Sequence, residues 1–260
     1  MPETGSKPAA ASRAERERVA YDEQGVFEAS NAWHVRFRHV FESPNTLRNE
    51  RLFEQRLRAR VGGARVLDIG CGDGESSERL LGLGAACVRG IDVAETFIER
   101  AKLREQPGRL EFASQDVGQP LAGRFDVIFG RAILHHLDWR EVLARLHADN
   151  LAPGGMMIFM EPLGGNLLTR LFHGLARKAH TLDERPFESD DLRWLRRSFE
   201  SLEILPINYV SFPAGLVSSY LFRRADNAMM RLCDRVDTWL ARHAAFLMPR
   251  FRQAIFVIGK

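Results

Sequence analysis

The stretch that decides the fold is Val66-Leu67-Asp68-Ile69-Gly70-Cys71-Gly72-Asp73-Gly74. A mostly apolar, strand-like run leads directly into glycines at every second position. Glycine lets the backbone turn sharply and approach a ligand with no Cβ in the way. Ligands of open α/β sheets bind beyond the carboxyl ends of the strands, so this turn is a candidate binding loop.

The sequence around this loop alternates between strand-like and helix-like segments. The strand-like runs are Arg65–Ile69, Ala86–Ile91, Leu110–Ser114, Phe125–Phe129, Met156–Met160, Leu202–Val210 and Gln253–Gly259. Helical patterns separate most of them, at Glu75–Leu81, Ala94–Arg104, Trp139–Leu151, Leu167–Lys178, Ser189–Phe199 and about 214–246. Near-continuous apolar strands that alternate with helices predict an α/β fold with a doubly wound, mostly parallel sheet.

The composition is that of a globular protein. The chain has 260 residues, of which 45% are apolar and 27% charged, and its formal net charge is +3. It contains no apolar run long enough for a transmembrane helix, and its charge is too small to indicate a nucleic-acid partner. Three cysteines without a C-x-x-C pair favour reduced thiols, and no apolar leader follows Met1, so we expect a cytoplasmic protein.

Acidic residues follow three successive strands. Asp68 precedes the glycines, Gly90-Ile91-Asp92 ends the second strand, and Gln115-Asp116-Val117 ends the third. An acid at the second position can accept hydrogen bonds from both ribose hydroxyls, and one at the third can accept from an exocyclic amine such as adenine N6. The dinucleotide fingerprint is broken, because G-x-G-x-x-G counted from Gly70 ends on Glu75. A nicotinamide-dependent oxidoreductase is therefore disfavoured.

Five segments together resemble the class I S-adenosylmethionine (SAM)-dependent methyltransferases: VLDIGCGDG, GIDVA, SQDV, FDVIFGRAILHHLD and LAPGGMMIFMEP. The resemblance implies a Rossmann-like sheet of seven strands, the last one antiparallel, with SAM as the cofactor. It places Asp68, Gly70, Cys71 and Gly72 near the methionine moiety. It also places Asp92 and Val93 at the ribose, Asp116 and Val117 at the adenine, and Arg131 near the sulfonium.

Residues 1–18 contain almost no large apolar side chains, so we expect a disordered tail or a frayed helix there. The resemblance implies one methyltransferase domain over 19–260, with a nucleotide-binding core at 46–162 and acceptor-side helices at 163–200 and 213–248. Methyl transfer needs a dry pocket, which predicts a lid. The lid candidates are the helix before the last strand and the N-terminal aromatic residues Tyr21, Phe27, Trp33 and Phe37.

The acceptor is predicted to be a small molecule. Family members that methylate nucleic acids or glutamine usually carry Asn/Asp-Pro-Pro-aromatic after the fourth strand, whereas this chain has Gly130-Arg131-Ala132-Ile133. Oxygen ligands are not clustered after the fourth and fifth strands, so we expect no metal. The helical pattern at 214–246 interleaves apolar residues with arginines, which favours an ordinary amphipathic helix over membrane or lipid contact. The oligomeric state stays open.

Three residues are candidates for catalysis. His135 and His136 follow the fourth strand, where an imidazole can take a proton from a hydroxyl or can simply hold the loop. Glu161 ends the fifth strand and can bind the acceptor, act as base or cap the next helix. The segment His180–Pro186 is either a surface turn or the rim of the acceptor site.

These observations predict a SAM-dependent methyltransferase that O-methylates a natural product or a lipophilic metabolite. The alternatives are C- or N-methylation of a quinone-like or lipid-like acceptor, and a protein that binds SAM without transferring a methyl group.

Overall fold

A computed structural model describes residues 11–23, 26–165, 181 and 183–260, without the side chains of 27–30. The helix predicted at Leu167–Lys178 and the side chain of Phe27 lie outside this part of the chain. None of the described helices is both long and apolar enough to span a membrane.

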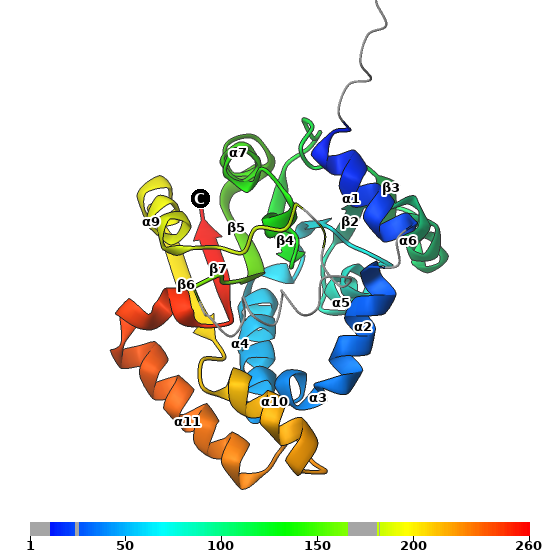
Figure 1. Cartoon of the computed structure of the whole chain (residues 1–260). Helices are drawn as coiled ribbons and strands as arrows, with labels where there is room; N and C mark the ends of the chain where they lie inside the picture. The colour runs from blue at the N-terminus through cyan, green and yellow to red at the C-terminus, as the bar shows by residue number, and fades with distance from the viewer. Residues whose placement is uncertain (1–10, 24–25, 166–180, 182) are drawn as a thin grey trace, which may run out of the picture.

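One sheet of seven strands organises the molecule (Figure 1). The strands are β1 Arg65–Ile69, β2 Cys87–Asp92, β3 Leu110–Ser114, β4 Phe125–Arg131, β5 Leu151–Pro162, β6 Leu202–Ile207 and β7 Gln253–Gly259. Their order is β3-β2-β1-β4-β5-β7-β6, and β7 runs antiparallel to both of its neighbours. This arrangement confirms the predicted fold class, including the antiparallel last strand.

Helices cover both faces of the sheet because successive strand residues point to opposite sides. Leu67 and Ile69 of β1 pack with α7 (Trp139–Arg145) and α9 (Ser189–Ser198). Val66 of the same strand belongs to the opposite core. That core is formed with α4 (Pro44–Val61), α5 (Glu75–Gly82) and α6 (Glu95–Ala101). The two buried layers hold the strand ends, and hence the loops that follow them, in fixed positions.

The N-terminal segment differs from the expected tail. Residues 13–18, predicted to be disordered or a frayed helix, begin helix α1 (Arg13–Asp22), which is followed by α2 (Val26–Arg36) and α3 (Arg38–Phe41). Ser12 caps α1 by accepting a hydrogen bond from the Glu15 backbone N–H. Few apolar residues mark this helix in the sequence, and its buried side chains include the charged Glu17, whose partners lie far along the chain.

The long helical pattern at 214–246 is two helices rather than one. Helix α10 (Ser211–Leu221) ends before a short connection, and α11 (Ala228–His243) folds back against it. Asn227 starts the second helix by accepting a hydrogen bond from the Met230 N–H. Buried Asp237 of α11 accepts hydrogen bonds from the backbone N–H groups of Tyr209, Val210 and Ser211 at the start of α10. Capping side chains therefore set a hairpin that hydrophobic periodicity alone does not mark.

Candidate active site

A cavity of about 490 Å³ opens at the carboxyl ends of β1 to β4. This volume is typical of sites for small organic ligands. Its walls come from the glycine loop, the three loops after β2, β3 and β4, and helix α1. Seven predicted cofactor residues line it: Gly70, Gly72, Asp92, Val93, Asp116, Val117 and Arg131.

The glycine loop has the backbone shape that its sequence predicts. Gly70, Gly72 and Gly74 all have positive φ, at 66°, 54° and 81°. A Cβ on Gly70 would meet Ile133 at 2.7 Å, and one on Gly74 would meet Phe112 at 2.6 Å. A Cβ on Gly72 would meet nothing within 4 Å. Gly70 and Gly74 thus serve packing, while Gly72 leaves room on the cavity side for a ligand.

Asp92 and Asp116 stand at two neighbouring strand ends and both line the cavity. Asp92 accepts hydrogen bonds from the N–H groups of Gly72 at 2.9 Å and Ala94 at 3.0 Å, which fixes the carboxylate against the glycine loop. Burial raises its pKa, although these backbone hydrogen bonds oppose the shift. Each carboxylate oxygen can accept a further hydrogen bond. The pair can therefore receive hydroxyl and amine donors from one ligand.

Asp68 and Cys71 take positions different from the other predicted cofactor residues. Neither lines the cavity. Asp68 is buried and accepts a hydrogen bond from the Ser77 hydroxyl at 2.6 Å, which ties the end of β1 to α5. Burial raises its pKa to about 7 despite that hydrogen bond. Of the three acids at successive strand ends, two therefore line the cavity, and the geometry favours a supporting role for Asp68 beneath the glycine loop.

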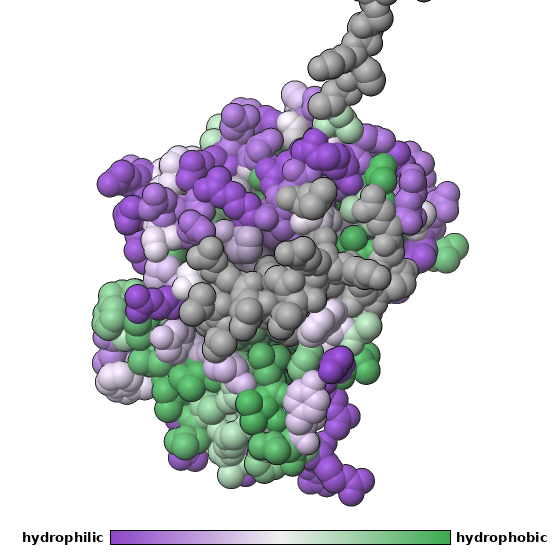
Figure 2. Space-filling model, in the orientation of Figure 1, coloured by the Kyte–Doolittle hydropathy of each residue, from purple (hydrophilic) through white to green (hydrophobic). Residues whose placement is uncertain are grey.

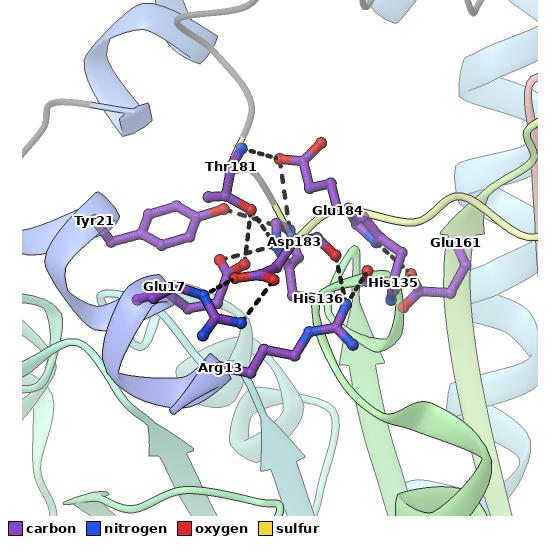
Figure 3. Close-up of polar contacts among 10 residues, drawn as sticks. Arg13, Glu17, Tyr21, His135, His136, Glu161, Thr181, Asp183 and Glu184 are labelled. Carbon is purple, nitrogen blue, oxygen red and sulfur yellow. Dashed lines mark hydrogen bonds and ion pairs between the residues drawn. The ribbon is translucent and has the colours of Figure 1, made fainter. Parts of the chain in front are cut away.

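His136 is the candidate catalytic residue that faces the cavity, and it is paired with an acid that sequence reasoning missed (Figure 3). Its Nδ1 lies 3.0 Å from Glu17 of α1. Because a carboxylate only accepts hydrogen bonds, Nδ1 carries the proton and Nε2 is left as the basic nitrogen. Nε2 lies 3.5 Å from the Tyr21 hydroxyl and 4.0 Å from Glu184.

His135 and Glu161 form a second imidazole–carboxylate pair on the other side of the loop. His135 Nδ1 lies 2.8 Å from Glu161, whose carboxylate also accepts hydrogen bonds from the N–H groups of Ile133 and Leu134. Glu161 is completely buried, and neither residue lines the cavity. These contacts give Glu161 and His135 the geometry of positioning residues that hold the turn presenting His136.

The two imidazoles have opposite pKa shifts. Burial lowers the pKa of His135, and the neighbouring His136 lowers it further. Burial also acts to lower the pKa of His136, but the hydrogen bond and charge of Glu17, together with the charge of Glu184, outweigh it and leave that pKa raised. His136 is therefore the stronger base of the two.

The segment around Asp183 contacts helix α1, and both predicted readings, a surface turn with paired charges and a rim of the acceptor site, stay open. Arg16 of α1 binds Asp183 through two hydrogen bonds, of 2.7 and 2.9 Å. Thr181 donates to Glu17 at 2.7 Å, and Arg13 donates to the Asp183 carbonyl. Helix α1 thus lines one side of the cavity, and this segment is hydrogen-bonded to α1. No residue of α10 or α11 lines the cavity. Of the predicted N-terminal lid residues, Tyr21 lines it, whereas Trp33 and Phe37 pack against Val40 and Phe212 instead.

One group of described residues has the spacing of possible metal ligands. His135, His136 and Glu184 offer atoms that lie within 4.8 Å of one another. Both Nδ1 atoms are already engaged by carboxylates, so a metal would use the Nε2 atoms. The expectation that no metal is needed stays a prediction.

Comparison with known proteins shows what this chain is similar to. A family model described as a methyltransferase domain matches residues 67–157. Ubiquinone biosynthesis O-methyltransferase of Neisseria meningitidis serogroup C is 33% identical over 107 residues, 39% of this chain and 45% of that protein. tRNA U34 carboxymethyltransferase of Azotobacter vinelandii is 39% identical over 104 residues, 37% of this chain and 32% of that protein. The chain therefore spans less than half the length of these two relatives.

Solved structures agree in fold. Phosphoethanolamine N-methyltransferase 2 of Haemonchus contortus, in complex with S-adenosyl-L-methionine, aligns with a TM-score of 0.64 at 18% identity, over 98% of this chain and 61% of that one. Magnesium protoporphyrin IX methyltransferase of Synechocystis, with bound SAM, aligns at 0.53 and 15% identity, over 98% and 100%.

SAM is the cofactor of proteins with this domain, and the cavity fits it in two respects. Gly72 leaves open space on the cavity side, and Asp92 and Asp116 offer acceptors at adjacent strand ends. Residues 67–157 of this chain match the methyltransferase-domain family, and the chain as a whole shares the fold of the two solved methyltransferases.

Proposed function

We propose that this protein transfers the methyl group of SAM to a hydroxyl oxygen of a small organic acceptor. The observation that carries the proposal is the buried His136–Glu17 pair beside the cavity. A neutral hydroxyl must lose its proton as it is methylated, so a positioned base has a use there. The O-methyltransferase among the relatives is consistent with such an acceptor.

Different residues bind SAM and accept the proton. Asp92 and Val93 hold the ribose, Asp116 and Val117 the adenine, and Gly70, Gly72 and Arg131 border the methionine end. Bound SAM supplies an activated methyl group on a sulfonium. With SAM and an acceptor bound, His136 Nε2 would take the hydroxyl proton as the acceptor oxygen gained the methyl group from the sulfonium sulfur. Glu17 stabilises the imidazolium that forms, as the acid of a catalytic triad does.

Water exclusion comes from helix α1. Arg13, Glu17 and Tyr21 line the cavity from that helix, and the Arg16–Asp183 pair ties it to the segment before α9. A closed, desolvated cavity strengthens the electrostatic contacts inside it and keeps acceptor and donor in line.

The test is methyl transfer from labelled SAM to a panel of phenols and matched anilines, read as the mass gain of one methylene group. We expect methylated phenols, and we expect His136→Gln to lower turnover by about 10²–10⁴ with SAM affinity unchanged by calorimetry. His243→Gln, at the exposed end of α11, is the control. Transfer to anilines alone, or full turnover of His136→Gln, contradicts the proposal.

The tRNA-modifying relative makes RNA the rival acceptor class. Total tRNA added to the same assay discriminates between the two. Labelled RNA in the absence of labelled phenol would replace the small-molecule acceptor.

A further inference from the structure

Exposed large apolar side chains gather on one helical hairpin. Eight of the eleven such residues in the described part of the chain lie between 217 and 246. Figure 2 shows apolar surface over the lower part of the molecule, where Figure 1 places α10 and α11. Single exposed apolar residues are normal, whereas a contiguous group marks a surface that contacts something.

Helix α10 is apolar on its outer face as well as on the inner face that packs Phe212 into the domain. Its inner face carries Gly215 and Ser218, which pack against α3, where His39 Nδ1 lies 2.9 Å from the Ser218 hydroxyl. Its outer face carries Val217, Tyr220 and Leu221, exposed by 52%, 65% and 68%. The helix contains no charged residue. Exposed helix faces in soluble proteins are normally polar, so this face is built for an apolar environment.

Helix α11 adds an apolar stripe with a row of arginines beside it. Leu232, Val236 and Trp239 are exposed and follow the spacing of one helix face. A second row lies next to this stripe and consists of Arg231, Arg235 and Arg242. A tryptophan-bearing apolar stripe flanked by arginines is the pattern of a helix that lies in a membrane interface.

The acids of this hairpin do not cancel its outward positive charge. Asp237 is buried and caps α10, and Asp234 pairs with Arg48 of α4 at 3.0 Å. Asp226 pairs with Arg231 at 2.8 Å. Arg235 and Arg242 form no ion pair with a carboxylate in the described ranges. The surface around the apolar stripe is therefore cationic and complements an anionic one.

We propose that the α10–α11 hairpin docks on the surface of an anionic lipid bilayer, with Leu221 and Trp239 entering the interface and Arg235 and Arg242 at the headgroups. A second copy of this chain is the alternative occupant, and antiparallel two-fold packing of α11 would set the arginine rows of the two copies beside each other. The proposal does not depend on the acceptor or on methyl transfer.

Co-sedimentation of the full chain with two kinds of vesicle tests the proposal, using phosphatidylcholine alone and phosphatidylcholine mixed with phosphatidylglycerol. We expect binding to the anionic vesicles that weakens as salt is added. Leu221→Glu combined with Trp239→Glu should lower the partition coefficient by roughly tenfold or more. Leu103→Glu is the matched control, because Leu103 is 88% exposed but lies far from the hairpin in sequence, after α6.

A second variant separates charge from apolar contact and does not touch the apolar stripe. Arg235→Glu combined with Arg242→Glu should remove the preference for anionic vesicles. SAM affinity by calorimetry shows that each variant is folded. Equal sedimentation with and without vesicles, or loss of binding in Leu103→Glu as well, overturns the proposal. A dimer in light scattering that Trp239→Glu dissolves would assign the face to a second copy instead.

Discussion

At the scale of single residues, the ionisable groups of the site differ in burial and in partner, and these two factors decide what each can do. Asp92 borders the cavity and is held by two backbone N–H groups, whereas Asp68 lies beneath the loop on the Ser77 hydroxyl. The strand-end pattern predicts that both acids belong to the site. It does not predict which of them lines the cavity, because that depends on the direction of each side chain after a tight turn.

Asp68→Asn should make the fold less sensitive to pH. Burial raises the pKa of Asp68 to about 7 in the folded chain, above the value of about 4 expected when unfolded. Burial of the neutral carboxyl group therefore adds to the free energy of unfolding at low pH. This contribution is lost as the pH rises from about 4 to about 7. Asparagine stays neutral and can still accept from Ser77. In thermal unfolding, the melting temperature of the variant relative to wild type should rise through that window; a constant difference contradicts the assignment.

Glu17→Gln should move the acidic limb of the turnover profile to lower pH. Glu17 raises the pKa of His136 against the opposing effect of burial, and glutamine removes the charge responsible. Since only neutral imidazole accepts a proton, the active form then appears at lower pH. The maximal turnover rate falls as well, because the imidazolium loses the carboxylate that stabilises it. Initial rates across a pH series measure both effects. An unmoved limb would mean that His136 is not the titrating group.

At the scale of elements, the sequence predicts strands better than it predicts helix ends. Apolar runs mark all seven strands, most clearly β1, β4 and β5 in the middle of the sheet, where nearly every strand residue is buried or half-buried. Helix α1 could not be read in the same way, since Glu17 is charged and its burial depends on His136, more than a hundred residues away. The break between α10 and α11 likewise depends on Asn227 and Asp237 acting as caps.

Asp22→Ala should loosen α1. The Asp22 carboxylate accepts hydrogen bonds from the Glu95 and Thr96 N–H groups and from the Thr96 hydroxyl, so it caps α6 from a neighbouring helix. Losing such a cap costs about 1 kcal/mol. We expect faster amide exchange over 13–22 and weaker SAM binding. Glu15→Ala, on the same helix and paired with Arg18, is the control. Unchanged exchange in Asp22→Ala would show that α1 is held by other contacts.

At the scale of the whole molecule, two parts of one sheet edge carry different properties. Because β6 runs parallel to β1–β5, the α10–α11 hairpin also follows a carboxyl strand end. The carboxyl ends of the strands and α1 form the cavity, and the α10–α11 hairpin, which contributes nothing to that cavity, carries the apolar surface. The cavity could be predicted from the sequence, because its acids and glycines directly follow predicted strands. The apolar surface could not, since the pattern at 214–246 does not state which side of each helix meets the domain.

Removal of metals should leave turnover intact. His135, His136 and Glu184 come within reach of a shared ion, but His136 Nε2 has a use as base and the Nδ1 atoms are held by carboxylates. After treatment with a chelator and gel filtration, we expect the initial rate to match that of the untreated protein. A rate that collapses and returns with added zinc would make the cluster a metal site and remove His136 as the base.

The central claim is that one cavity holds SAM with Asp92 at its ribose and His136 at its reactive end. A crystal structure of the complex with S-adenosylhomocysteine tests it most directly. The account predicts ribose hydroxyls within hydrogen-bond distance of the Asp92 carboxylate, adenine beside Asp116 and Val117, and the sulfur on the His136 side. A ligand bound elsewhere, or a ribose with no contact to Asp92, contradicts it.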